Sequence, residues 1–220
     1  MRKHGARSPL IVKLYRHYLD NQDSAGFITR VSRQYTTGTL LRLTEHTQRR
    51  VRRASVLALG FLADYDANAT LGRALHDPDR AVRMIAENAI RNVWSRAGSE
   101  AERHALAIIV RLNAAHRYED AARRATELIA WSSEFAEAWN QRAVGHFGLE
   151  QYEASIRDCH QALELNPYHF GAASGMGLAF LRLGDQVAAL ECFRRALRLN
   201  PDLEGIRVQV ARLTKRIEEK

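Results

Sequence analysis

Apolar residues recur at intervals of three and four along most of this 220-residue chain, with charged residues between them. This spacing places apolar side chains along one face of a helix. Residues 10–34 show the pattern in one or two predicted helices, at Leu10, Leu14, Tyr18, Phe27 and Val31. The segment after Pro201 shows it again, at Leu203, Ile206, Val210, Leu213 and Ile217. The pattern therefore predicts an all-α protein.

One segment of the chain returns 34 residues later in nearly the same form. Ala162–Pro167 reads Ala-Leu-Glu-Leu-Asn-Pro, and Ala196–Pro201 reads Ala-Leu-Arg-Leu-Asn-Pro. At the same offset, small residues meet small residues, as in Ala143 and Gly177. Small residues let two helices cross closely, and a fixed period of this length indicates a solenoid of stacked helix pairs.

This combination of period, residue size and Asn-Pro punctuation resembles the tetratricopeptide repeat, a helix–turn–helix unit of 34 residues. One unit carries the family's pattern at Trp139, Ala143, His146, Ser155, Cys159, Ala162 and Pro167. The next carries it at Ala173, Gly177, Phe180, Ala189, Phe193, Ala196 and Pro201. An earlier unit aligns by Tyr118-Glu119 but has Ala105, Ile109 and Ser133 where the family has Trp, a small residue and Pro. The resemblance implies repeats at about 102–135, 136–169 and 170–203, with a capping helix at 204–220.

The N-terminal half repeats with a different period. Val51-Arg52 returns as Val82-Arg83, 31 residues later, and an apolar stretch before the second copy closes with Asp-Pro-Asp. Asp77 is expected to cap the following helix, with the proline after it in the first turn. This string resembles a HEAT repeat, which implies that Asp77 and Arg83 join a ladder of hydrogen bonds between successive units.

The two halves are expected to meet near Gly98-Ser99, where Ser99-x-x-Glu102 predicts a capping box and a new helix. We therefore expect a HEAT-like segment at 1–98 and a tetratricopeptide segment at 99–220.

The tetratricopeptide resemblance implies that a ligand would lie on the concave face formed by the first helix of each repeat. By family position, this groove consists of Leu106, Val110, Asn113, Asn140, Val144, Phe147, Ser174, Leu178 and Leu181. A family subtype that clamps chaperone C-termini has Lys, Asn and Arg at positions held here by Leu106, Val110, Gln141, Gly171 and Gly175. A mostly apolar groove favours an apolar helix or extended peptide of a protein partner. The alternative occupants are the chain's own capping helix and a second copy of the chain.

Positive charge is concentrated in the N-terminal half. Residues 1–100 hold 17 Lys and Arg against 9 Asp and Glu, whereas residues 101–220 hold 16 of each. Arg49, Arg50 and Arg53 form a candidate basic patch, with Arg52 assigned to the repeat structure. A nucleic acid or another polyanion is therefore an alternative partner. Against it, 29 of the 33 cationic residues are Arg, a bias that base composition also produces.

The sequence shows no pattern for catalysis, metal binding or a cofactor. The nine histidines lack a zinc-protease spacing, and Cys159-His160 point about 100° apart on a helix. Gly171, Gly175 and Gly177 are assigned to close helix contacts, not to a phosphate loop. We expect no catalytic residue, no metal ligand and no cofactor. A bilin lyase-type enzyme or its accessory stays an alternative because one such group uses HEAT-like units, an argument from fold alone.

The remaining features favour a cytoplasmic interaction scaffold that is not an enzyme. No apolar run reaches the roughly 18 residues of a membrane span, and Lys13 and Arg16 interrupt the apolar start that a signal peptide would need. Cys159 and Cys192 are expected to be buried thiols. Homo-oligomer formation is left open.

Overall fold

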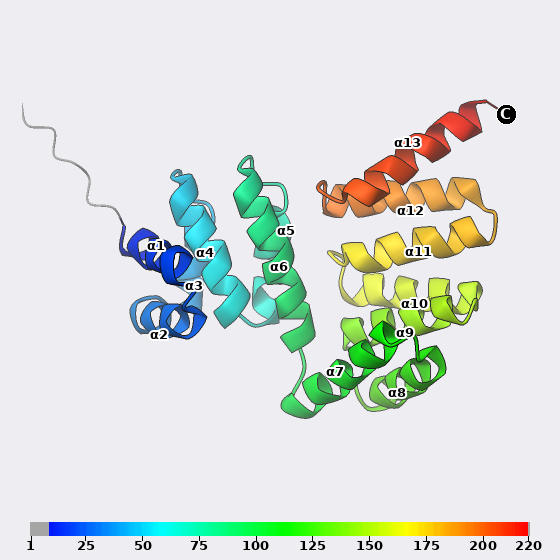
Figure 1. The fold of residues 1–220 in the computed structure, drawn as a ribbon, viewed down its shortest axis with the longest axis horizontal. Coiled ribbons are helices and arrows are strands. Elements are labelled where there is room, and N and C mark those ends of the chain that lie inside the picture. Colours follow the sequence, from blue (N-terminus) through cyan, green and yellow to red (C-terminus); the bar gives the residue numbers. More distant parts are fainter. Residues whose placement is uncertain (1–8, 220) are drawn as a thin grey trace, which may run out of the picture. The chain divides into compact units, whose positions relative to one another are not determined.

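The computed structural model describes residues 9–219, which form helices and turns without a strand (Figure 1). The first half contains α1 (Leu10–Asn21), α2 (Ser24–Gln34), α3 (Thr37–Leu43), α4 (Arg49–Leu62), a short 3-10 helix (Tyr65–Ala67), α5 (Asn68–Ala74) and α6 (Arg80–Arg96). The second half contains α7 (Glu100–Ala114), α8 (Tyr118–Trp131), α9 (Ala136–Gly148), α10 (Tyr152–Leu165), α11 (Phe170–Arg182), α12 (Gln186–Leu199) and α13 (Glu204–Glu218). The all-α prediction is confirmed.

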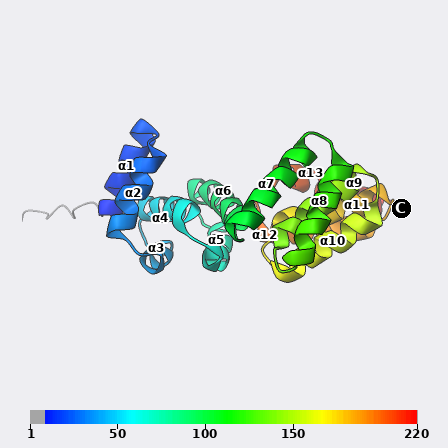
Figure 2. The same ribbon diagram turned by 90° about the horizontal axis from the view of Figure 1, so that it is seen from below.

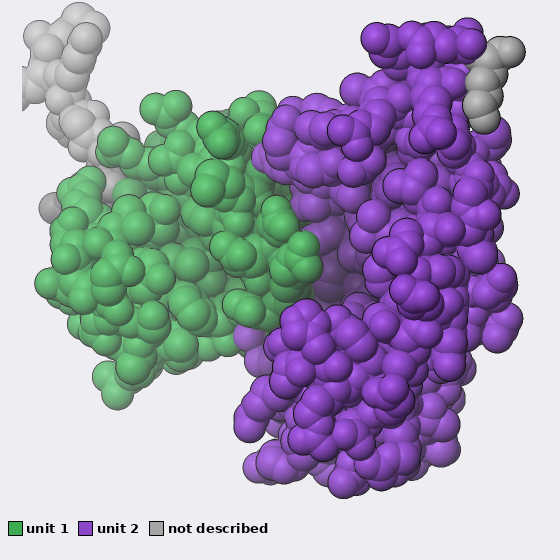
Figure 3. Space-filling view, turned by 45° about the vertical axis from the view of Figure 1, so that its right-hand side comes forward, with its two compact units in different colours: residues 1–93 green, residues 94–220 purple. Residues whose placement is uncertain are grey.

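The helices gather into two compact units, residues 1–93 and 94–220 (Figure 3). The boundary lies in the last turn of α6, shortly before the predicted junction at 98–99. Ser99 caps α7 as predicted: its Oγ accepts a hydrogen bond from the N–H of Glu102 at 3.3 Å. The Glu102 carboxylate in turn accepts the N–H of Ser99, which completes the capping box.

The first unit buries its core between α1, α2 and the longer helices α4 and α6. Tyr18, Phe27 and Phe61 form an aromatic cluster with ring centroids 5.3–6.3 Å apart. The prediction that Leu10 lies on the buried face of α1 is wrong, because Leu10 is 44% exposed whereas Ile11 and Val12 are buried. The N–H of Ile11 donates to the Tyr35 hydroxyl at 3.0 Å, which fixes the start of α1.

Two ion pairs join α4 to the turn between α5 and α6. Arg52 donates to Asp77 through Nε and Nη2 at 2.6 and 2.9 Å, and Arg53 donates to Asp79 at 2.8 and 2.6 Å. Arg83 contacts Asp77 through the backbone carbonyl, at 3.0 Å. The expected cap is wrong by two residues, since Asp79, not Asp77, accepts the N–H of Val82 in the first turn of α6. The HEAT-like character of this unit stays a prediction.

The Arg53–Asp79 pair makes stability depend on pH. The hydrogen bonds from Arg53 lower the pKa of Asp79 from 3.8 to about 2. Because the folded state holds the lower pKa, the carboxylate's stabilisation is complete above pH 4 and is lost as the pH falls from about 4 to about 2. We expect the loss to be on the order of 1–2 kcal/mol. Urea titrations across this range should show a shallower pH dependence in Asp79→Asn than in the wild type, and identical slopes would contradict the pairing.

The second unit is a stack of antiparallel helix pairs. The pairs α7–α8, α9–α10 and α11–α12 follow one another, each in contact with the next, and α13 packs on α12 (Figures 1 and 2). The turns fall where the sequence predicts them, near 116, 150, 167 and 184. The equivalent turn residues His116, Glu150 and Gly184 all have positive φ, at 57°, 60° and 85°. The repeat of 34 residues is therefore also a repeat of backbone conformation.

Small residues stand where the helices of a pair cross. The Ser155 hydroxyl donates to the carbonyl of Ala143 at 2.9 Å, and a Cβ added at Gly177 would lie 2.6 Å from the Phe193 ring. This geometry requires a residue without a side chain at 177.

Gly177→Leu should therefore overpack the α11–α12 crossing and lower the free energy of unfolding by about 1–3 kcal/mol. The matched control is Gly205→Leu in α13, where an added Cβ meets nothing within 4 Å. Thermal unfolding followed by circular dichroism checks both variants. Equal melting temperatures for the two would show that the crossing is not tightly packed.

Candidate peptide-binding surface

The nine predicted groove residues occupy three equivalent positions on α7, α9 and α11, the first helix of each pair. The middle position is apolar and exposed in every repeat: Val110 is 42%, Val144 42% and Leu178 38% exposed. Helix α9 contacts both α7 and α11, so the three side chains belong to neighbouring helices. We call Val110, Val144 and Leu178 the apolar stripe.

The other two positions are only partly available to a ligand. The prediction is wrong for Leu106, which is 2% exposed and packs with Ile109, Leu128 and Phe135 between α7 and α8. It is also wrong for Asn113, which is 7% exposed. The Nδ2 of Asn113 donates to the backbone carbonyl and the side-chain oxygen of Gln141, at 2.9 and 3.0 Å. These two residues join helices together and do not face a ligand.

Asn140 and Ser174 are half-buried and already hold hydrogen bonds within the unit. Asn140 Nδ2 donates to the Glu137 carboxylate at 3.1 Å, and the Ser174 hydroxyl donates to the carbonyl of Phe170 at 2.8 Å. Asn140 thus supports its own helix, which reduces its capacity to hold a bound peptide.

Glu137 is the centre of a buried polar network that links α9 to the start of α11. Besides Asn140, its carboxylate accepts from Gln141 Nε2 at 2.8 Å and from His169 Nε2 at 3.0 Å. His169 Nδ1 accepts the N–H of Ala172, so the ring proton lies on Nε2. Burial raises the pKa of Glu137, but these hydrogen bonds outweigh it and bring the pKa below its usual value. The network holds α9 and α11 in register beneath the stripe.

Phe147 lies in a small cluster of rings and charges at the end of the predicted groove. Its ring meets Tyr152 at 5.5 Å, and the Arg182 guanidinium lies 5.9 Å from Phe147 and 5.1 Å from Tyr152. Arg182 also lies 3.5 Å from Glu150. The sequence shows no sign of this cluster, because its members come from α9, α10, α11 and a turn and share no regular spacing.

The capping helix covers only one end of the predicted surface. Leu181 packs with Phe193 and Leu213, so α13 reaches the last predicted groove residue. Val110, Val144 and Leu178 remain exposed with α13 in place. The alternative that α13 occupies the predicted groove is therefore supported at Leu181 but not at Val110, Val144 or Leu178.

Within residues 9–219, only two of the three residues of the predicted basic patch are exposed and free of an ion pair. Arg49 and Arg50 are exposed, but Arg53 is bound to Asp79 by two hydrogen bonds. The prediction is therefore wrong for Arg53, whose guanidinium serves the packing of α4 on the α5–α6 turn. Arg52 has the expected structural role, through its ion pair with Asp77.

The described residues offer no group for metal chemistry and no reactive thiol. Within 9–219, no three His, Cys, Asp or Glu side chains converge on a point where a metal ion would fit. Cys159 and Cys192 are free and buried, and burial raises the pKa of Cys159 to about 12. A thiol with so high a pKa stays protonated and is a poor nucleophile. None of the helices in this range has the length and apolar character needed to cross a membrane.

Comparison with protein families matches the tetratricopeptide repeat to residues 136–169 and 171–203. A TPR repeat-containing protein of Rhizobium etli is 30% identical over 141 residues, which are 64% of this chain and 68% of that protein. The Hsp70-Hsp90 organizing protein of Triticum aestivum is 28% identical over 97 residues, 44% of this chain and 17% of that protein. The two family matches span α9 and α11, which carry Val144 and Leu178 of the apolar stripe.

Among solved structures, the first TPR of Spaghetti (RPAP3) bound to the HSP90 peptide SRMEEVD is similar in fold. It has a TM-score of 0.52 and 19% identity, and the match covers 55% of this chain and 96% of that one. The first TPR domain of human RPAP3 gives a TM-score of 0.51 at 19% identity, covering 54% of this chain and 93% of that one. At this identity the likeness concerns the fold.

Proposed function

The chain belongs to the tetratricopeptide repeat family, and we propose from this premise that it is a non-enzymatic adaptor that captures an apolar segment of a partner protein. Its similarity to an HSP90-peptide complex and to a chaperone-organizing protein supports a role in protein–protein interaction. The apolar stripe is the proposed contact surface.

One observation carries this proposal. The positions of Val110, Val144 and Leu178 are exposed and apolar in all three repeats, whereas most of their groove neighbours are buried or bonded within the unit. Exposing three aliphatic side chains on adjacent helices is unfavourable in water unless another apolar surface covers them. A stripe that repeats with the helix pairs suits an elongated ligand, such as the apolar face of a helix.

The proposed ligand differs from the acidic peptide bound by the RPAP3 domain. The positions of the chaperone clamp hold Leu106, Val110, Gln141, Gly171 and Gly175 in this chain, none of which is cationic. Carboxylate recognition needs cations or well-directed donors at such positions. In this proposal, apolar contacts therefore supply the affinity for the peptide. Arg182 and Glu150, at the end of the predicted groove, fix the orientation of the bound peptide.

The test is a selection of peptides from a random library on the immobilised full chain. We expect sequences with apolar residues at helical spacing, and we expect their binding to be lost when Val144 is replaced by Glu. Enrichment of acidic C-termini instead would contradict an apolar ligand. Failure to enrich any sequence over a bare surface would contradict peptide capture itself.

A further inference from the structure

A second surface of different chemistry lies in the first unit, along two neighbouring turns. Residues 42–53 contain the α3–α4 turn, and residues 73–80 contain the α5–α6 turn. The Arg52–Asp77 ion pair, at 2.6 Å, joins them directly, and Arg73 lies 3.8 Å from Glu45. We call these two segments together the turn edge.

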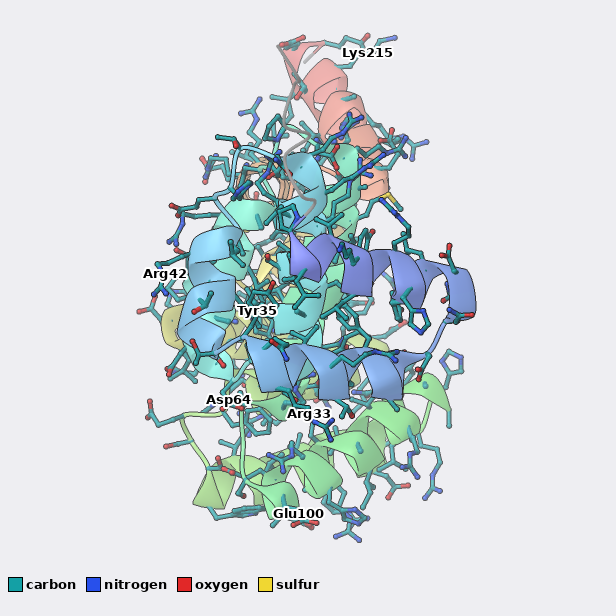
Figure 4. All side chains as sticks on the ribbon, turned by 90° about the vertical axis from the view of Figure 1, so that its left-hand side faces the viewer. Arg33, Tyr35, Arg42, Asp64, Glu100 and Lys215 are labelled. Carbon is teal, nitrogen blue, oxygen red and sulfur yellow. The ribbon has the colours of Figure 1, made fainter. Side chains whose placement is uncertain are left out.

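The turn edge carries far more positive than negative charge. It contains seven arginines and three acidic residues, which are Glu45, Asp77 and Asp79. Asp77 and Asp79 are bound to Arg52 and Arg53, as described above. Glu45 is the exposed acidic residue of the edge, and it lies 3.8 Å from Arg73. Five arginines of the edge are exposed, which are Arg42, Arg49, Arg50, Arg73 and Arg80. Figure 4 shows one of them, Arg42, projecting from the side of α3.

These charges are placed against local electrostatic preference. The first turn of α4 holds Arg49 and Arg50 and no acidic residue. Helix α6 begins with Arg80, but Asp79 directly before it caps its first turn. The positive end of the α4 dipole favours anions, so Arg49 and Arg50 in that turn cost stability. A negative ligand would offset this excess of positive charge, and local rules are most often broken where a protein binds.

The same edge has a hollow with hydrogen-bonding walls. Its volume is about 370 Å³, and its lining includes three hydroxyl residues, Thr44, Thr47 and Thr70. Arg52 and Arg73 also line it, beside the acidic residues Asp77 and Glu45. Arg73 donates to the Thr70 hydroxyl at 3.0 Å, which holds its guanidinium beside the opening. Guanidinium groups bind planar carboxylates by two parallel hydrogen bonds, a contact that ammonium groups do not make.

We propose that the turn edge binds an acidic peptide segment of a protein partner. Neither segment of the edge contains Phe, Tyr or Trp. A single-stranded nucleic acid is usually held by base stacking on such rings, so phosphate contacts alone would remain for it. A run of carboxylates needs only the arginines and hydroxyls that are present. This site is independent of the apolar stripe and of the function proposed for it.

The test measures binding of a fluorescent peptide of alternating glutamate and serine to the full chain by anisotropy. We expect binding at low salt that weakens as salt is added, and no binding of the matching glutamine–serine peptide. The triple variant Arg49→Gln, Arg50→Gln, Arg73→Gln should bind about tenfold more weakly, from the loss of three exposed pairs. The matched control Arg33→Gln, Arg194→Gln, Arg198→Gln removes the same charge from α2 and α12 and should change affinity less than about twofold.

Arg→Lys replacement at the three turn-edge positions separates geometry from charge. We expect it to restore only part of the affinity, because lysine keeps the charge and loses the paired hydrogen bonds. All variants should melt as the wild type does, since the replaced side chains are exposed. If the turn-edge and control variants lose the same affinity for the acidic peptide, net charge alone explains the binding and the proposal is overturned. Tighter binding of single-stranded DNA than of the acidic peptide would overturn the choice of ligand.

Discussion

Replacing Arg142 by methionine should lower the free energy of unfolding by about 3–5 kcal/mol, because it removes two short charged hydrogen bonds from a buried carboxylate and leaves it only His146, 3.6 Å away. Arg142 donates to both oxygens of Asp158 at 2.7 Å. The Asp158 residue is only 5% exposed, and the pair joins α9 to α10 within one repeat. Urea unfolding followed by circular dichroism measures the loss.

The control for this prediction is Arg194→Met on the exposed face of α12, which should change the free energy of unfolding by less than about 0.5 kcal/mol. Removing the acid as well, in Arg142→Met with Asp158→Leu, should recover much of the loss, since no unpaired charge then remains. If Arg142→Met unfolds at the same urea concentration as Arg194→Met, the pair is not what holds α9 against α10.

The largest expected effect on binding comes from Val144→Glu, which should abolish detectable capture of a selected apolar peptide. Val144 lies between Val110 and Leu178 on the central helix of the three, so a carboxylate there must be desolvated beneath any ligand that spans the stripe. Burying an unpaired charge costs several kcal/mol, which would weaken a micromolar peptide by roughly a hundredfold or more and bring its binding below detection. Isothermal titration of the wild type and the variant with the same peptide measures the change.

Two exposed valines elsewhere provide matched controls for the binding experiment. Val187 on α12 is 58% exposed and Val208 on α13 is 53% exposed. Val187→Glu and Val208→Glu add the same charge and should leave affinity unchanged. All three variants should keep the wild-type melting temperature, because each adds a charge to a surface. Equal loss of binding in the controls would assign the effect to net charge and not to the stripe.

The fold could be predicted in the second unit because its repeat constrains local and tertiary structure together. A small residue at Gly177 is needed against Phe193, and a Cβ at Gly148 would lie 2.5 Å from the ring of Tyr118. The small residue at 177 recurs 34 residues earlier as Ala143, so the period reveals this crossing, whereas the Gly148 contact has no counterpart at Arg182. The first unit was harder to predict from the sequence. Asp77 and Asp79 are both plausible N-caps of α6, and only their pairing with Arg52 and Arg53 in the folded unit distinguishes them.

The candidate site could be predicted only in part, since family position gives a helix face but not what lies across from it. Leu106 is buried because it packs into the apolar cluster between α7 and α8. Asn113 is buried because its side chain bonds to Gln141 on the neighbouring helix α9. The sequence does not reveal that Arg53 is paired, because its partner Asp79 lies 26 residues away. Pairings of this kind depend on tertiary contacts that carry no periodic signal.

The central claim is that a peptide lies along Val110, Val144 and Leu178. Methyl NMR spectra of the full chain, recorded while a selected apolar peptide is added, test it most directly. The account predicts that the methyl signals of these three residues shift together and saturate at one affinity, while those of Val187 and Val208 stay in place. Shifts confined to other methyl groups, with the three stripe residues unchanged at saturation, would contradict it.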